Sequence, residues 1–331
     1  MPSRLSIFSS RIFGSALIWT VLAVALIEWR AARTLPGRFS SHEVDQLLYD
    51  LDQGRIPADD TVFLGDSVGR QIANGILRQH PGAFVPLACN AAIEIPGQYY
   101  LLQRYLENHP APRRLILMMG HPLAGELQGD YTENYVQRVF LRWREIAGLT
   151  RARRSLRFGL VMAAYKLSPA FRFRLRLQKA VPFLETPDPY FGWLDLSAAP
   201  AAPEKPEAFS LLELIARGLE KYRGGPGISK RYFQQLAQLL EARGVDWVYL
   251  PLPVPESAAR MIAPDGDYDR QVRRVREQSL RFSRLQVVGP FSVHPDGWFY
   301  DGAHLTEEQL PVVAKEYAAR LAARGFLEPA P

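Results

Sequence analysis

The chain has 331 residues, of which 47% are hydrophobic and 22% are charged, and its formal net charge is +6. This composition suits a chain with a sizeable core and excludes disorder throughout. The single cysteine, Cys89, excludes an internal disulfide framework and a cysteine-rich metal site. The sequence has no nucleic-acid-binding module and no histidine pair at metal-ligand spacing, so we expect no nucleic acid, metal or other cofactor.

The N-terminus predicts a membrane anchor. Residues 1–11 form a short basic tail, residues 12–27 carry no charge, and we place a transmembrane signal anchor over 12–29. That length is at the short end of the roughly 17–25 residues that span a bilayer. A cleaved signal peptide and a buried helix are the alternatives, but no small-residue cleavage site directly follows the run. We expect the tail inside and the rest of the chain outside.

Residues 30–58 are interpreted as a connector, with a short amphipathic helix over 42–51. Strands and helices alternate from residue 59 onward, which predicts an α/β domain over 59–328 whose parallel sheet is covered on both faces. Strands are predicted at 61–64, 84–88, 115–119, 247–252 and 285–288, and helices at 68–79, 98–108, 230–243 and 268–282. A final helix is predicted to start at Thr306, which is a plausible N-cap.

A long insertion separates the third and fourth predicted strands. Residues 121–226 far exceed a normal connection and include helical patterns at 136–146 and 160–167. We interpret the insertion as a lid or a partner surface above the carboxyl ends of the strands, where α/β sheets place their sites.

A serine stands at the end of the first strand. In the stretch TVFLGDSVGR, Ser67 follows a short apolar run and opens a helix, which exposes its hydroxyl. Its backbone N–H also lies among the unpaired donors of a helix N-terminus, where an oxyanion is favoured. That is the geometry of an acyl-transfer nucleophile. For an isolated Gly-Asp-Ser the alternative is that Asp66 and Ser67 only cap the helix.

A second motif, YDGAHLT, follows the last predicted strand. Asp301 and His304 are three residues apart, so their side chains can lie on one side of a turn. Asp301 would then accept a hydrogen bond from one ring nitrogen of His304, while the other nitrogen takes the proton of Ser67. Both motifs follow strands of the predicted parallel sheet, so we expect them at the same edge.

Together the two motifs resemble those of the SGNH, or GDSL, hydrolase superfamily, over about residues 59–327. The resemblance implies a three-layer α/β/α flavodoxin-like fold, with Ser67 as nucleophile and Asp301 and His304 as orienting acid and base. It also implies an oxyanion hole that includes the N–H of Ser67 and that of a glycine after the second strand. Gly97 is the candidate glycine, Ala91 or Ala92 are the alternatives, and Asp66 and Asn90 are candidate supporting residues.

The third motif of this superfamily contributes an asparagine to the oxyanion hole, and this chain lacks it. The third strand is followed by Gly120, His121 and Pro122, so His121 or a backbone N–H is the candidate substitute. Losing one oxyanion donor costs about 10²–10³ in rate in well-studied enzymes. This departure argues against efficient hydrolysis of free esters.

With its anchor, missing asparagine and large insertion, the chain is similar to envelope O-acetylation proteins, including the alginate-acetylation and D-alanyl-transfer groups. The resemblance implies an acyltransferase or acyl-esterase in the bacterial inner membrane, with its catalytic domain facing the periplasm or cell exterior. It implies two partners: a polysaccharide or other hydroxyl acceptor, and a membrane-bound O-acyltransferase. Two alternatives stay open: a lipid or small-ester hydrolase of the same fold, and a catalytically degenerate scaffold that binds a glycan or a membrane partner.

Overall fold

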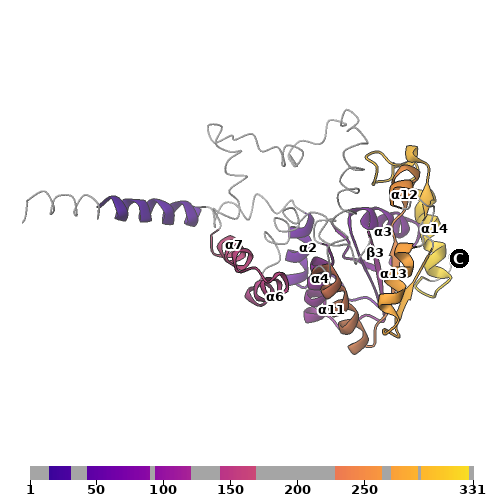
Figure 1. Cartoon of the computed structure of the whole chain (residues 1–331), viewed down its shortest axis with the longest axis horizontal. Coiled ribbons are helices and arrows are strands. Elements are labelled where there is room, and N and C mark those ends of the chain that lie inside the picture. Colours follow the sequence, from indigo (N-terminus) through magenta and orange to yellow (C-terminus); the bar gives the residue numbers. More distant parts are fainter. Residues whose placement is uncertain are drawn as a thin grey trace, which may run out of the picture. The chain divides into compact units, whose positions relative to one another are not determined.

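The computed structural model describes residues 15–30, 43–89, 94–120, 142–168, 228–262, 270–289 and 292–327 (Figure 1). The chain divides into two compact units. The first comprises Met1–His42 and Leu141–Ala198, and the second comprises Glu43–Phe140 and Ala199–Pro331. The second unit carries both sequence motifs, and its fold is what positions them.

The second unit alternates strands and helices in the way the sequence predicts. Its strands are β1 (Thr61–Gly65), β2 (Val85–Pro86), β3 (Arg114–Met119), β4 (Asp246–Pro251), β5 (Val254–Pro255), β6 (Leu285–Val287) and β7 (Val293–His294). Its helices are α2 (Glu43–Asp52), α3 (Ser67–Gln79), α4 (Glu94–Asn108), α11 (Ile228–Ala242), α12 (Glu256–Ile262), α13 (Arg270–Ser279), α14 (Leu310–Ala322) and the 3₁₀ turn η5 (Asp296–Trp298).

The central sheet has five strands in the order β2-β1-β3-β4-β6, and every neighbouring pair is parallel. The predicted parallel sheet, with all five predicted strands, is therefore confirmed. The chain order reverses beside β1, which lies between β2 and β3, and ligands of open α/β sheets bind at such a switch point. A separate pair, β5 and β7, was not predicted because strands of two residues carry no readable period.

Both faces of the sheet are covered by helices. All five residues of β1 are buried, as a strand covered on both faces requires. On one face Phe63 and Ile116 join a core cluster with residues of α3 and α14. On the other, Trp247 packs against Phe233 of α11. Within this unit, α4 and α11 lie on one side of β3, and α3 and α14 on the other (Figure 1). This α/β arrangement is consistent with three layers.

The final helix begins later than predicted. Its N-cap is Gln309 rather than Thr306, whose carbonyl instead accepts hydrogen bonds from the N–H groups of Gln309 and Leu310. Pro311 explains the difference, because proline fits only the first turn of a helix. Once formed, α14 packs closely on α3: a Cβ built on Gly75 would lie 2.7 Å from that of Ala314.

The first unit contains a helix over 15–30, α6 (Trp143–Arg153) and α7 (Leu156–Leu167). The helix over 15–30 exposes many apolar side chains: Leu17, Ile18, Trp19, Val21, Leu22, Val24, Leu26, Ile27 and Trp29. In the part of the chain that the structure describes, no helix is long and apolar enough to cross a membrane. Residues 12–14 of the predicted anchor lie outside that part, and the anchor stays a prediction.

Only α6 and α7 of the predicted insertion, residues 121–226, are described. Residues 136–141 of its first predicted helix lie outside the described part, while the second, 160–167, forms the C-terminal portion of α7. The interpretation of the insertion as a lid or partner surface stays a prediction.

Candidate active site

Ser67 is the first residue of α3, at the switch point of the sheet. The N-cap of that helix is Asp66, whose Oδ1 accepts hydrogen bonds from the N–H groups of Val68 and Gly69, each at 3.0 Å. The capping alternative therefore applies to Asp66 and not to Ser67. The Ser67 hydroxyl is left available for a different partner.

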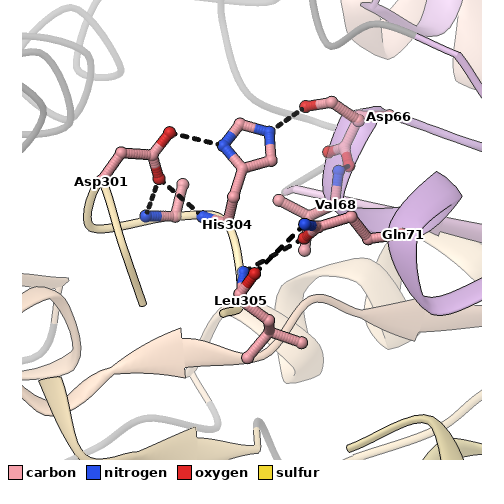
Figure 2. Close-up of polar contacts among 8 residues, drawn as sticks. Asp66, Val68, Gln71, Asp301, His304 and Leu305 are labelled. Carbon is pink, nitrogen blue, oxygen red and sulfur yellow. Dashed lines mark hydrogen bonds and ion pairs between the residues drawn. The ribbon is translucent and has the colours of Figure 1, made fainter. Parts of the chain in front are cut away.

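That partner is His304. Its Nε2 lies 2.8 Å from the Oγ of Ser67, and its Nδ1 lies 2.7 Å from the Oδ2 of Asp301. Figure 2 shows the Asp301 carboxylate and the His304 ring facing one another. With Asp301 accepting from the Nδ1–H, Nε2 is the acceptor for the hydroxyl proton of Ser67. The three residues meet in one chain of hydrogen bonds, and their catalytic roles stay predictions.

A tight turn holds Asp301 and His304 in this relation. The Oδ1 of Asp301 accepts hydrogen bonds from the N–H groups of Ala303 (3.0 Å) and His304 (2.8 Å). Gly302, which lies between Asp301 and Ala303, has a φ of +80°, a backbone conformation that residues with a Cβ atom rarely adopt. The turn is closed by an antiparallel bridge between Phe299 and Leu305. We call residues 299–306 the histidine loop.

The negative charge of Asp301 is stabilised by hydrogen bonds from His304. Partial burial acts to raise the pKa of Asp301, but the hydrogen bonds from the side chain and backbone of His304 outweigh it and lower that pKa. Asp301 is therefore ionised at neutral pH and remains an acceptor for the His304 ring. The ring of Tyr300 stacks on that of His304, with the ring centroids 5.6 Å apart, and Tyr300 is 56% exposed.

Asp66 has a second role besides capping. Its Oδ2 accepts the N–H of Gly120 at 3.0 Å, so one carboxylate joins the start of α3 to the residue after β3. Burial raises the pKa of Asp66, although its backbone hydrogen bonds and the nearby His304 ring oppose the shift. The predicted supporting position of Asp66 beside Ser67 agrees with these contacts.

Two glycines allow the start of α3 to pack closely against the end of β3. A Cβ on either Gly65 or Gly69 would clash with the carbonyl oxygen of Met118. The same carbonyl accepts the N–H of Asp66 at 3.3 Å. The two glycines of the GDSVG stretch thus let α3 and Ser67 lie directly against the end of β3.

The donors at this helix end are mostly occupied. The N–H groups of Val68, Gly69 and Gly120 bond to Asp66. Within the described residues the N–H of Ser67 has no hydrogen-bond acceptor, because the first N–H groups of a helix lack an internal partner. Among the described residues, the N–H of Ser67 is therefore available to an oxyanion, and its role as a donor stays a prediction.

The prediction that Gly97 opens a helix is wrong. Helix α4 begins at Glu94, so Gly97 is its fourth residue and lies inside the first turn rather than before it. Pro96 explains the earlier start, since proline is favoured in a first helical turn. The oxyanion role of Gly97 stays a prediction. The other candidates, Asn90, Ala91, Ala92 and His121, lie outside the described residues.

The sequence did not identify two glutamines that contact the site. Gln71 of α3 bonds to both backbone groups of Leu305: its Oε1 accepts the N–H at 3.1 Å and its Nε2 donates to the C=O at 3.2 Å (Figure 2). Gln98 of α4 is fully buried and donates to the carbonyl of Gly65 at 2.8 Å. Neither glutamine belongs to a motif, and a bond from a side chain to a distant backbone group leaves no pattern in the sequence.

A second serine–histidine contact exists in the same unit. The Oγ of Ser292 lies 2.8 Å from the Nε2 of His294 and donates to Glu316 at 2.6 Å. Ser292 is only 5% exposed, and His294 stacks on Trp298. The burial of this serine makes it a packing element rather than a nucleophile.

Among the described residues, no group of three or more His, Cys, Asp or Glu is placed to hold a metal ion.

Comparison of the chain with protein-family models, with curated proteins and with solved structures finds no match. Membership of the SGNH superfamily stays a prediction, and the functional interpretation depends on the geometry of the site.

Proposed function

We propose that the protein is a serine-dependent acyl-esterase or O-acyltransferase of the SGNH type, with Ser67 as nucleophile, His304 as base and Asp301 as the residue that orients the base. The observation that carries the proposal is the 2.8 Å contact between Ser67 Oγ and His304 Nε2, backed by Asp301 at 2.7 Å. Acyl transfer by a serine uses a nucleophile within hydrogen-bond reach of a base. A third group orients that base.

In the first half-reaction, the Oγ of Ser67 attacks the carbonyl carbon of an acyl ester while its proton passes to Nε2 of His304. The N–H of Ser67 donates to the oxyanion that forms. The tetrahedral intermediate then collapses, His304 returns the proton to the departing alkoxide, and the acyl group remains as an ester on Ser67. In the second half-reaction a hydroxyl acceptor loses its proton to His304, takes the acyl group and restores the Ser67 hydroxyl.

The nature of the acceptor separates an esterase from a transferase. Water as acceptor gives hydrolysis, and a sugar hydroxyl gives transfer. Asp66 occupies the N–H groups of Val68, Gly69 and Gly120, so the described part of the site has few oxyanion donors, and the asparagine of the third motif is absent from the sequence. A depleted oxyanion hole slows both half-reactions, whichever hydroxyl attacks. The missing donor therefore argues against efficient hydrolysis of free esters, and the activity depends on which acceptor the site holds.

The proposal also covers the fold family and the cellular location of the protein. A flavodoxin-like SGNH domain over 59–328 is supported by the strand order β2-β1-β3-β4-β6, with Ser67 after the first strand and the histidine loop before the last helix. We also propose an N-terminal membrane anchor from the exposed apolar side chains of the helix over 15–30, although no described helix is long and apolar enough to cross a membrane. We propose an acceptor glycan of the cell envelope, a membrane-bound O-acyltransferase as acyl donor, and a catalytic domain outside the inner membrane.

The test is to trap the acyl-enzyme. The full chain in detergent would be mixed with p-nitrophenyl acetate and examined by intact-protein mass spectrometry, with Ser67→Ala beside it. Ser292→Ala is a matched control, because it removes a serine that also contacts a histidine. We expect one acetyl group on the wild type and on Ser292→Ala, and none on Ser67→Ala.

The fate of the acetyl group then distinguishes the alternatives. Discharge that is accelerated by an acidic oligosaccharide, with acetyl recovered on the sugar, is expected for a transferase. Discharge to water alone would favour the small-ester hydrolase. No acetyl-enzyme in a folded protein would contradict the proposal and favour the degenerate scaffold.

A further inference from the structure

We propose that Gln71 is a positioning residue that sets the distance between the base His304 and the nucleophile Ser67; this inference rests on the proposed function of Ser67. The side-chain amide of Gln71 bonds to both backbone groups of Leu305, the residue that follows His304 (Figure 2). No other side-chain amide among the described residues bonds to the backbone of the histidine loop.

The helix that carries Ser67 also carries Gln71. The two residues are four apart in α3, and residues at that spacing lie on the same face of a helix, one above the other. An α-helix is a stiff element, so a group fixed to Gln71 is held at a defined distance from Ser67. Because Leu305 is joined covalently to His304, fixing Leu305 fixes the position of the ring relative to the Ser67 hydroxyl.

The chemistry of the side chain suits this contact. A primary amide offers one acceptor and two donors, which match the N–H and the C=O of a single residue. The contact extends the pairing of the histidine loop, in which Phe299 already bridges Leu305. Leu305 is 1% exposed and belongs to the core cluster, so an unmatched N–H or C=O here would be costly.

The histidine loop shapes itself without Gln71. Asp301 bonds to the backbone N–H groups of Ala303 and His304 and to the His304 ring, and all of these contacts lie inside the loop. Loss of Gln71 should therefore leave the Asp301–His304 pair intact while it loosens the contact of His304 with Ser67. This separation is what distinguishes a positioning role from a general contribution to stability.

The same helix offers a matched control. Gln79 of α3 also uses its Nε2 to bond to a backbone carbonyl of the C-terminal region, that of Pro311 at 3.1 Å. That contact reaches α14 rather than the histidine loop. Gln71→Met and Gln79→Met each remove one side-chain amide from α3 with little change of volume.

The first measurement is the rate at which a fluorophosphonate probe labels Ser67 in the full chain. We expect Gln71→Met to slow labelling about 10- to 100-fold, since small misplacements of catalytic groups can cost about 100-fold. Gln79→Met should stay within about twofold of wild type, with both variants folded by thermal unfolding. A rate within twofold of wild type for Gln71→Met, or an equal loss in both variants, would overturn the proposal.

A conservative variant gives a pH-dependent rescue. In Gln71→Glu the ionised carboxylate offers only acceptors and repels the Leu305 carbonyl, whereas the protonated form again has a donor and an acceptor. The ratio of its labelling rate to that of wild type should therefore rise as the pH falls from 7 towards the ordinary glutamate pKa of about 4.3. A flat ratio would contradict the proposed hydrogen bonds.

A spectroscopic measurement keeps the inference separate from the proposed activity. In the full chain labelled with ¹⁵N-histidine, Gln71→Met should shift the Nε2 signal of His304 and leave its Nδ1 signal in place, and Gln79→Met should change neither. If the wild type is not labelled by the probe, the proposed function fails, but these spectra still decide the role of Gln71. Unchanged signals in Gln71→Met would overturn it.

Discussion

Ser67 and His304 are 237 residues apart in the chain, and their side chains lie 2.8 Å apart. Strand β1, which precedes Ser67, and β6 are separated in the sheet by β3 and β4. The shared edge of the sheet therefore does not by itself bring the two residues together. The close packing of α14 on α3 does, because the histidine loop leads directly into α14.

Asp301→Asn should reduce acylation of Ser67 about 10³–10⁴-fold, as expected when a catalytic histidine loses the carboxylate that sets its tautomer. The asparagine amide can donate to Nδ1, which would place the ring proton on Nε2 and prevent that nitrogen from accepting the Ser67 proton. The rate of acylation by p-nitrophenyl acetate measures the effect. Asp296→Asn is the control, because Asp296 also accepts a backbone N–H, that of Ser257, at 2.9 Å. An Asp301→Asn rate near wild type would exclude Asp301 as the orienting residue.

Gly69→Ala should destabilise the second unit even though alanine is the better helix former. The gain in helix propensity is about 1 kcal/mol. Against it, the added methyl group would clash with the carbonyl oxygen of Met118, which is backbone of a central strand and cannot rotate away. Overpacking of this kind costs about 1–3 kcal/mol.

Denaturant unfolding measures the Gly69→Ala effect, with Gly297→Ala as the control, because a Cβ at Gly297 meets nothing within 4 Å. We expect a lower midpoint for Gly69→Ala and little change for Gly297→Ala. A Gly69→Ala midpoint above that of wild type would mean that α3 does not lie against β3 as described.

His294 should make stability depend on pH. Burial lowers the pKa of His294 below its ordinary value of 6.5 and outweighs the nearby Glu316 carboxylate, which acts to raise it. The unfolded chain therefore binds this proton more readily than the folded chain. The stability associated with neutral His294 is fully present above pH 6.5 and is lost as the pH falls through the lower folded pKa.

His294→Gln should flatten this dependence below pH 6.5, because glutamine does not titrate and its amide can still bond to Ser292. Unfolding midpoints at several pH values provide the measurement. Equal slopes in wild type and His294→Gln would show that this histidine is not the cause.

The parts of the fold that the sequence predicted are those with a strong local signal. Buried strands such as β1 are short apolar runs, and the GDS and DxxH motifs each place reactive side chains within one turn. Residues 67, 301 and 304 were therefore found from the sequence, whereas the packing of α14 on α3 that brings His304 to Ser67 was not predicted.

The errors have local physical causes. Pro311 delays α14 beyond Thr306, and Pro96 moves the start of α4 ahead of Gly97. Gln71 was missed for a different reason: its partners are backbone groups of a residue 234 positions away, and such a contact leaves no pattern in the sequence. Local periodicity therefore does not predict where a helix starts near a proline. It also does not predict long-range hydrogen bonds from a side chain to the backbone.

The most direct test of the proposed function is covalent labelling of the full chain with a fluorophosphonate probe, with Ser67→Ala and Ser292→Ala beside it. The site predicts one label on the wild type, located at Ser67 by peptide mass spectrometry, the same label on Ser292→Ala, and none on Ser67→Ala. The folded state of Ser67→Ala should be retained, since Asp66 and not Ser67 caps α3. An unlabelled wild type that is folded, or a label that persists in Ser67→Ala, would contradict the assignment of Ser67 as an activated nucleophile.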